Sequence, residues 1–252
     1  LRRSLEQYRP NVIVHLAAIP IADASKRFIE DMFAINLQGT TNILTAAKDL
    51  NGAVRRVVYT SSSMAYGDFT SENPAAEDHP TRPLETYGAT KLAGEILTGS
   101  FQTMFGLETV VIRPSAVYGP TDCNRRIVQR MIESGLEGRE VTLFNGGTSR
   151  LDFTFVEDVA EGFYLAATHP AAAGGTFNLT RGQGRTLLEL SEIVKQHLPD
   201  LKIKLAGEDP VKRPERGTLD ISRARKTLGY NPKFSLEDGV ARYVEFYRHL
   251  EA

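Results

Sequence analysis

The chain has 252 residues, of which 41% are hydrophobic and 24% are charged, a composition typical of a globular protein with a sizeable core. Thirty basic and 31 acidic residues give a net charge of -1, which excludes a bulk positive field that would attract nucleic acid or an anionic membrane. The single cysteine, Cys123, excludes an internal disulfide, and no Cys/His cluster has metal-ligand spacing. We therefore expect a cytoplasmic protein without a metal site, a nucleic-acid partner or a membrane partner.

The most apolar run, residues 12–22, is about half as long as a membrane-spanning helix needs to be. It also contains His15 and Pro20. The basic opening segment, LRRSLEQYRP, is not followed by the apolar region and cleavage site of a secretory signal. The sequence therefore predicts no transmembrane segment.

Apolar runs rich in Val and Ile alternate with longer segments of helical period, the pattern of strand–helix–strand units in a parallel sheet. Pro114 ends one of these strands because it lacks the N–H that a central strand requires. In chain order the first half predicts a strand at 11–18, a helix at 25–50, a strand at 55–62, a helix at 87–105 and a strand at 107–114.

After Gly119 the predicted elements become shorter. Thr186 and Glu189 have capping-box spacing at the start of one helix. The second half predicts a helix near 127–134, a strand near 141–144, a turn at 146–147, a helix at 156–170, a strand at 176–180, a helix at 186–198 and a helix from near 235 to the end.

A tyrosine, a lysine and a run of serines form the candidate catalytic group. Tyr87 and Lys91 stand one turn apart on one helix face, and an ammonium there would lower the pKa of the phenol from about 10. Ser61, Ser62 and Ser63 follow a strand, at the carboxyl end where open parallel sheets place ligand crevices. This arrangement suits oxidation of a secondary alcohol with hydride leaving to a cofactor. Taken alone, the tyrosine and lysine also fit an ordinary pair on a helix surface. The serines also fit an ordinary turn after a strand.

Seven segments occur in an order that resembles the extended short-chain dehydrogenase/reductases, in particular the nucleotide-sugar epimerases and dehydratases. The later two blocks are FNGGTSRLDFTFVEDVA and DISRARKTLGYNPKFSLEDGV. The earlier five are HLAA (15–18), NLQGTTN (36–42), SSSMAYG (61–67), YGATK (87–91) and IRPSAVYGP (112–120). The resemblance covers nearly the whole chain.

The resemblance implies a role for each candidate residue. Tyr87 is the general acid/base, Lys91 lowers the pKa of Tyr87 and holds the nicotinamide ribose, and Ser62 is the second hydroxyl on the substrate. Ser62 is chosen because it lies four residues before Tyr66. Asn36 and Thr40 are expected to be structural. Ala17, Ala18, Pro114 and Ser115 are expected to border NAD, with NADP not excluded. The nucleotide sugar is expected to contact Ser63, Arg150 and Arg213, and Arg216 in the same segment is a second candidate for its diphosphate. Packing or solvation is the alternative role for each of these residues.

The resemblance further implies an α/β fold, a doubly wound parallel sheet of Rossmann type with a smaller α+β C-terminal substrate lobe. We expect residues 1–118 to form part of the NAD-binding domain, to which 151–180 return. Residues 119–150 and 181–252 are then the substrate lobe. A homodimer through the helices near 26–50 and 87–105 is also implied.

The residues after Ser62 favour one reaction within the family. Dehydratases and decarboxylases need a further acid or base there, whereas this chain has Ser63, Met64 and Ala65. A 4-epimerase needs a single acid/base, so an NAD-dependent epimerase of a nucleotide-diphosphate sugar is the first expectation. The alternatives are a sugar dehydrogenase or reductase, and a non-catalytic binding protein with this fold.

Three departures from the family pattern remain. Leu151 stands where the family commonly has Arg, with Arg150 one position earlier, and Ala116 stands where it often has Asn. The sequence also contains no Gly-x-x-Gly-x-x-Gly turn, whose amides hold the cofactor pyrophosphate. From this absence and the missing initiator methionine we expect a fragment that lacks the first strands and binds the cofactor weakly or not at all.

Overall fold

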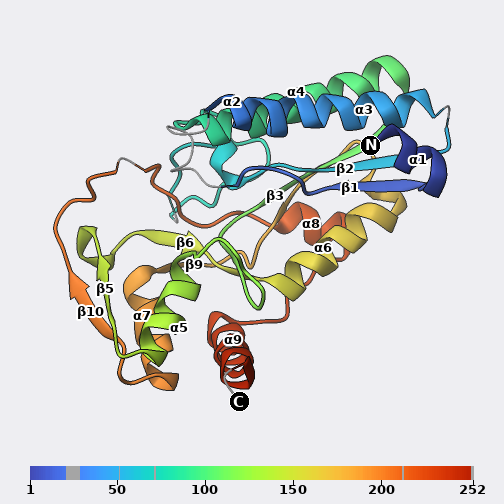
Figure 1. Ribbon diagram of the computed structural model, residues 1–252. Helices are drawn as coiled ribbons and strands as arrows, with labels where there is room; N and C mark the ends of the chain where they lie inside the picture. Colours follow the sequence, from blue (N-terminus) through green and yellow to red (C-terminus); the bar gives the residue numbers. More distant parts are fainter. Residues whose placement is uncertain (21–28, 51, 71, 212, 251–252) are drawn as a thin grey trace.

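A four-stranded parallel sheet forms the centre of the molecule (Figure 1). The computed structural model describes residues 1–20, 29–50, 52–70, 72–211 and 213–250. The strand order is β1-β2-β3-β8, and the strands are Val12–His15, Arg56–Thr60, Glu108–Pro114 and Thr176–Leu179. This sheet confirms the predicted α/β class and the first three predicted strands, each shortened at its ends.

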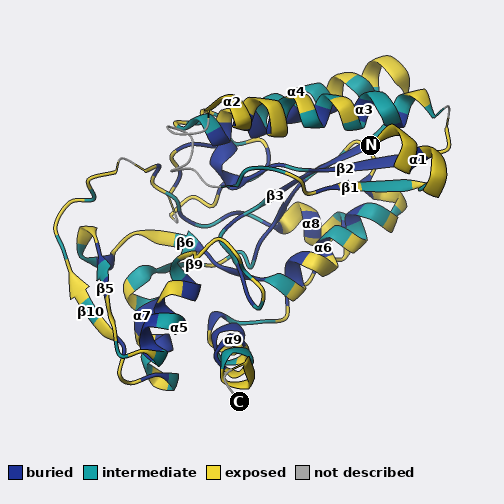
Figure 2. Cartoon of the chain, viewed as in Figure 1, coloured by how far each residue is buried: buried dark blue, intermediate teal, exposed yellow. Residues whose placement is uncertain are grey.

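Helices cover both faces of the sheet (Figure 1). The alternation of side chains along β2 shows why, because Val57 packs in the cluster of Leu44 and Leu107 while Val58 packs with Ile112 and Phe177. Figure 2 shows the buried residues concentrated on the central strands and on the helix faces that meet them. On one face lie α3 (Gly39–Asp49) and α4 (Thr86–Phe105), and on the other α6 (Val156–Thr168) and α8 (Ser222–Leu228).

The helix predicted over 25–50 is divided into three parts. A short α-helix, α2 (Ile29–Met32), leads into a π-helix, η2 (Phe33–Gln38), which continues as α3. The first residues of that predicted helix, 25–28, lie outside the described residues. A π turn holds more residues than an α turn and so changes which side chains face inward. Ile35 is 44% exposed, whereas Asn36 is buried.

A second core lies in the C-terminal lobe. It contains Met131, Ile132, Leu190 and Val240. Its elements are α5 (Ile127–Leu136), α7 (Leu187–His197), α9 (Leu236–Leu250) and the parallel pair β5 (Glu140–Leu143) and β10 (Lys202–Leu205). The capping box predicted at the start of α7 is present.

One segment of the range assigned to the substrate lobe packs elsewhere. The α8 helix contacts β8, and Ile221, Leu228 and Tyr230 join the core cluster beneath the sheet. Part of the range 181–252 therefore belongs to the sheet layer, because these apolar side chains cover its second face.

Several short elements were not predicted, because two to seven residues carry little periodicity. Among the 3-10 turns, those at Ser63–Ala65 and Pro170–Ala172 were not predicted, whereas the one at Asn145–Gly147 lies where a turn was predicted. The others are α1 (Arg2–Tyr8), the parallel pair β4 (Val117–Tyr118) and β7 (Thr154–Phe155), and the antiparallel pair β6 (Arg150–Asp152) and β9 (Gly184–Thr186), together with α8 and β10. Within the described ranges, no helix combines the length and the apolar character needed to span a bilayer.

Candidate active site

The Ser62 hydroxyl and the Tyr87 phenol meet at the carboxyl end of β2. Ser62 is the N-cap of the turn at 63–65, and its Oγ accepts a hydrogen bond from the Met64 amide at 3.2 Å. Tyr87, in the first turn of α4, is 9% exposed, and the Ser62 hydroxyl lies close enough to act on the pKa of its phenol. Gly88 allows this approach, because a Cβ there would overlap the Met64 carbonyl oxygen. The fold thus joins two groups that are 25 residues apart in the chain.

Lys91 lies directly behind this pair. Its side chain is buried, and Nζ donates to the Thr60 carbonyl oxygen at 2.7 Å. The same Nζ lies 5.3 Å from the ring centroid of Tyr59 and 6.0 Å from that of Tyr87. Burial lowers the pKa of the Lys91 ammonium to about 8.

The pKa of Tyr87 moves in the direction opposite to the sequence-based expectation. Burial raises it, while the Ser62 hydrogen bond and the charges of Arg126 and Arg216 act to lower it. Burial therefore outweighs the groups that favour the phenolate, and the lowering of this pKa by Lys91 stays a prediction. Lys91 directs its ammonium at Thr60, while the phenol is withdrawn from water.

Two arginines from different elements act on Tyr87. Arg216 is half-buried, which lowers the pKa of its guanidinium to about 10, while the Glu85 carboxylate opposes that shift. Arg126 is the N-cap residue of α5 and donates to the Val117 carbonyl oxygen at 3.3 Å. No motif pointed to Arg126, and only the tertiary structure brings it near Tyr87.

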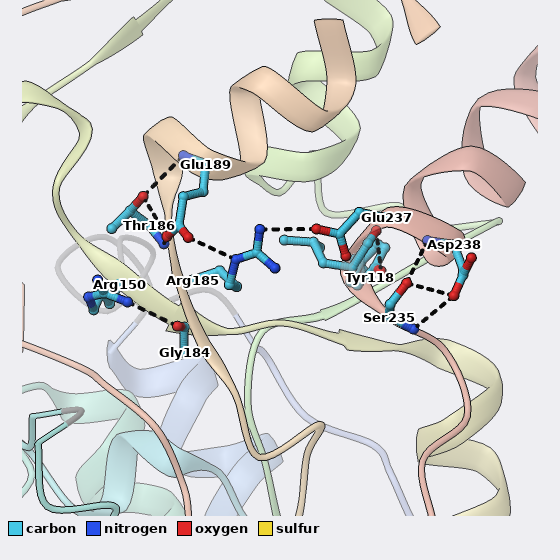
Figure 3. Close-up of polar contacts among 10 residues, drawn as sticks. Tyr118, Arg150, Gly184, Arg185, Thr186, Glu189, Ser235, Glu237 and Asp238 are labelled. Carbon is cyan, nitrogen blue, oxygen red and sulfur yellow. Dashed lines mark hydrogen bonds and ion pairs between the residues drawn. The ribbon is translucent and has the colours of Figure 1, made fainter. Parts of the chain in front are cut away.

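The two arginines assigned to the substrate from sequence lie in other surroundings. Arg213 is half-exposed and its Nε is 3.4 Å from a carboxylate oxygen of Asp209. Arg150 is exposed and donates to the Gly184 carbonyl oxygen at 3.0 Å across the β6–β9 pair (Figure 3). Leu151 points to the opposite face and packs on the lobe core, so the one-residue offset from the family pattern turns the guanidinium to the other side of the strand.

The ends of β2 and β3 meet through two serine hydroxyls. Ser63 Oγ donates to Ser115 Oγ at 3.1 Å, and both side chains are buried. Pro114, the last residue of β3, pairs with Leu179 of β8. Ser115 and Pro114 therefore lie at the carboxyl edge of the sheet, on the side where β2 carries Ser62.

Asn36 ties the segment after β1 to the catalytic helix. Its Oδ1 accepts from the Ile19 amide at 2.7 Å, and its Nδ2 donates to Thr90 Oγ1 at 3.2 Å. Thr90 Oγ1 in turn donates to the Tyr87 carbonyl oxygen at 2.8 Å. The π-helix turns Asn36 inward for these bonds, which supports the structural role expected for it.

His15 lies at the end of β1, where its imidazole is buried beside Thr40. Its Nε2 is 3.1 Å from Thr40 Oγ1, which donates to the Asn36 carbonyl oxygen. Burial and the charge of Lys91 lower the pKa of His15 to about 4. The imidazole is therefore neutral at pH 7, and Thr40 holds it within the wall of the site.

The carboxyl edge of the sheet fits the nicotinamide half of NAD. The ammonium of Lys91 has three N–H donors, of which Thr60 takes one, so it can reach ribose hydroxyls with the others. Ala17 is exposed and Ala18 is half-exposed after β1, and their small side chains leave the backbone open to a planar ring. Ser115 offers a hydroxyl at the next strand end. That these residues border the cofactor stays a prediction.

Comparison with known proteins identifies the relatives of this chain. The sequence model of the "NAD dependent epimerase/dehydratase family" matches residues 1–180. The UDP-glucose 4-epimerase of Mycolicibacterium smegmatis is 33% identical over 257 residues, which cover 97% of this chain and 78% of that protein.

Solved structures of 4-epimerases have the same fold. The Thermotoga maritima UDP-glucose 4-epimerase with UDP-glucose has a TM-score of 0.92 at 28% identity, covering 100% of this chain and 81% of that one. The UDP-glucuronic acid 4-epimerase of Bacillus cereus, in complex with UDP-glucuronic acid and NAD, has a TM-score of 0.90 at 27% identity, covering 99% and 78%. The chain therefore belongs to the NAD-dependent epimerase/dehydratase family, as its resemblance to the nucleotide-sugar enzymes implied.

Proposed function

We propose that this protein is an NAD-dependent 4-epimerase of a nucleotide-diphosphate sugar. The observation that carries the proposal is the placement of the Tyr87 phenol beside the Ser62 hydroxyl, with Lys91 Nζ 6.0 Å from the Tyr87 ring centroid and bonded to the Thr60 carbonyl oxygen. The similarity to UDP-sugar 4-epimerases supports the substrate class.

The Tyr87 phenol is the group that accepts and returns the proton of the sugar hydroxyl. Ser62 donates a hydrogen bond at the same place, and so favours the charged oxygen that forms when a proton leaves. Bound NAD would supply the hydride acceptor and donor together with a positive charge near the phenol. Burial raises the pKa of the Tyr87 phenol, and positive charge added beside it would act in the opposite direction and favour its role as a base.

Arg126 and Arg216 supply the charge that a sugar diphosphate requires. Planar guanidinium groups bind phosphate oxygens in pairs. The charges of both arginines act on Tyr87, so a diphosphate bound to them would bring the sugar near the phenol. The three residues after Ser62 are Ser63, Met64 and Ala65, which are buried and carry no carboxylate. This favours epimerisation over elimination of water.

The proposal is tested with NAD and UDP-glucose or UDP-glucuronate, followed by chromatography for the C4 epimer. Tyr87→Phe is expected to lower kcat by about 100-fold or more, because general acid–base catalysis contributes that much. The control is Tyr164→Phe, on the exposed side of α6, which should leave kcat unchanged. Steady accumulation of NADH would identify a sugar dehydrogenase instead. Binding of the nucleotide sugar without any turnover would leave a non-catalytic binding protein.

We also propose a homodimer in the cytoplasm, formed through the outer faces of α3 and α4. Ile96, Met104 and Phe105 of α4 are exposed apolar residues that a second copy would cover. Sedimentation equilibrium tests this, since Ile96→Lys should shift the mass to that of a monomer. Competition between NAD and NADP for the protein tests the choice of cofactor.

A further inference from the structure

We propose that Ser61 and Glu95 are positioning residues that fix the Tyr87 phenol against the Ser62 hydroxyl. The inference rests on the proposed function for its effect on turnover. It rests on the contacts between β2 and α4 for its geometry.

Three consecutive residues at the end of β2 bind the catalytic helix. The Tyr59 hydroxyl donates to the Lys91 carbonyl oxygen at 3.1 Å, and the Thr60 carbonyl oxygen accepts from Lys91 Nζ at 2.7 Å. Ser61 Oγ donates to Glu95 Oε1. Ser62, which follows, meets Tyr87. The segment 59–62 is therefore attached to α4 at every residue.

The bound residues of α4 lie along one stripe. Tyr87, Lys91 and Glu95 are four residues apart and so face the same side of the helix. A shift of the helix at Glu95 therefore moves the phenol at Tyr87 by a similar amount. The fit leaves little slack, because a Cβ at Gly94 would overlap the Tyr59 hydroxyl.

Glu95 is held in turn by a buried arginine of β3. Arg113 Nε donates to Glu95 Oε1 at 2.9 Å, and Arg113 Nη2 donates to Glu95 Oε2 at 2.6 Å. The two side chains are 7% and 9% exposed. The hydrogen bond to Glu95 raises the pKa of Arg113 although burial alone would lower it. The carboxylate thus keeps one position, from which it receives Ser61.

The same arginine anchors the pair to the rest of the molecule. Arg113 Nη1 donates to the Glu77 carbonyl oxygen at 2.9 Å, and the Arg113 guanidinium carbon lies 4.6 Å from the ring centroid of Tyr66. The Tyr66 hydroxyl donates to Asn178 Oδ1 of β8 at 2.7 Å. Through Arg113, the position of Glu95 is therefore fixed relative to β3, to β8 and to the segment after Ser62.

Stability alone does not account for this pair. Removing two opposite charges from water costs about as much as their attraction returns, so an apolar pair of the same volume would serve the core equally well. A charged pair, however, has directional bonds that an apolar pair lacks. In this site the bonds join Arg113 of β3 to Glu95, and Glu95 to Ser61, the residue next to Ser62.

Ser61→Ala tests the inference, because it removes one hydroxyl and leaves the Arg113–Glu95 pair in place. We expect kcat to fall about tenfold while KM changes less than about twofold, since a small displacement of a catalytic group lowers the rate without loss of binding. Ser191→Ala is the matched control, a buried serine of α7 bonded to the Leu188 carbonyl oxygen at 2.7 Å. It should leave kcat unchanged. An unchanged kcat in Ser61→Ala would overturn the inference.

A titration of Tyr87 separates this inference from the proposed function. The Cζ signal of labelled tyrosine, assigned with Tyr87→Phe, reports ionisation of the phenol without any substrate. In Ser61→Ala the pKa of Tyr87 should rise, because the Ser62 bond that favours the phenolate is weakened. If the unmodified protein turns over no sugar but this rise occurs, the positioning role stands and the proposed function fails. A titration curve equal to that of the unmodified protein would reject the positioning role.

Glu95→Gln provides a second variant. The amide keeps one acceptor for Ser61 but loses the charge that fixes it to Arg113. The double variant with Ser61→Ala should lose no more kcat than the more impaired single variant, since both changes break one chain of contacts. Additive losses would show that the two residues act separately and would contradict the inference.

Discussion

Burial and charge act in opposite directions on the Tyr87 phenol, and the balance depends on which arginines reach it. Arg216 is half-buried and acts on Tyr87, whereas Arg213, three residues earlier, is half-exposed beside Asp209. The sequence offered both and we expected Arg213 to bind the substrate. The environment of the two side chains now favours Arg216, because a withdrawn guanidinium is less screened by water.

We predict that Arg216→Gln weakens binding of UDP by about tenfold or more, the effect of a lost charge-assisted hydrogen bond. Arg213→Gln should weaken it only a few-fold. Isothermal calorimetry with UDP measures both without any need for turnover. A larger loss in Arg213→Gln would instead support the sequence-based assignment of Arg213.

A buried arginine joins two elements on the far side of the sheet. Arg56 of β2 is fully buried and its NH1 donates to the carbonyl oxygens of Ala166, Ala167 and His169, at 3.0, 3.1 and 2.8 Å. These groups end α6, where unpaired carbonyls and the helix dipole favour a cation. The Glu108 carboxylate balances the charge at 2.9 Å. Arg56 thereby fixes α6 against the sheet.

Arg56→Ala is expected to lower the free energy of unfolding by about 3 kcal/mol, near the lower end for a broken buried pair because Glu108 is partly exposed. Its neighbour Arg55 also contacts Glu108, at 3.4 Å, but is about half exposed. Arg55→Ala should therefore cost less than about 1 kcal/mol. Urea unfolding compares the two, and equal losses would refute the capping role of Arg56.

Across the whole molecule, Asp152 connects the lobe to the sheet layer. It is fully buried at the end of β6 and accepts hydrogen bonds from Thr180 Oγ1 at 2.9 Å, the Gly182 amide at 3.1 Å and the Leu219 amide at 3.1 Å. Thr180 directly follows β8, and Leu219 precedes α8. One carboxyl group thus holds three segments at the junction. Burial raises its pKa from 3.8 to about 6.

The raised pKa of Asp152 predicts how stability depends on pH. The folded protein holds this proton up to about pH 6, while the unfolded chain loses it near 3.8, so the stabilisation is complete below 3.8 and is lost as pH rises through about 6. The free energy of unfolding should therefore fall by roughly 3 kcal/mol relative to Asp152→Asn between about pH 4 and pH 8. Asp200→Asn, on the exposed turn after α7, is the control. A difference independent of pH would exclude this role.

The sequence predicted the elements that have strong hydrophobic periodicity or a clear start signal such as a capping box. Helix α4 was expected over 87–105 and spans Thr86–Phe105, and the capping box at Thr186 and Glu189 is present. The β2 and β3 strands were found where valines and isoleucines cluster. Strands of two or three residues, such as β4 and β7, were missed because they exist only through pairing with distant residues.

The candidate site divides in the same way. Motif spacing along the chain was enough to name Ser62, Tyr87 and Lys91, because a parallel sheet brings strand ends and the next helix to one edge. It was not enough to find Arg126, to choose between Arg213 and Arg216, or to give the direction in which the pKa of Tyr87 moves. Those depend on packing between segments far apart in sequence.

By itself, then, the sequence determined the α/β class, the family and the chemical identity of the candidate hydroxyls, since residue type and hydrophobic period can be read directly from the order of the amino acids. The tertiary structure decided which charges surround the phenol and how deeply it is buried. The physical reason is that desolvation and electrostatic interaction depend on distance through space, and distance is set only when the two layers of helices close on the sheet.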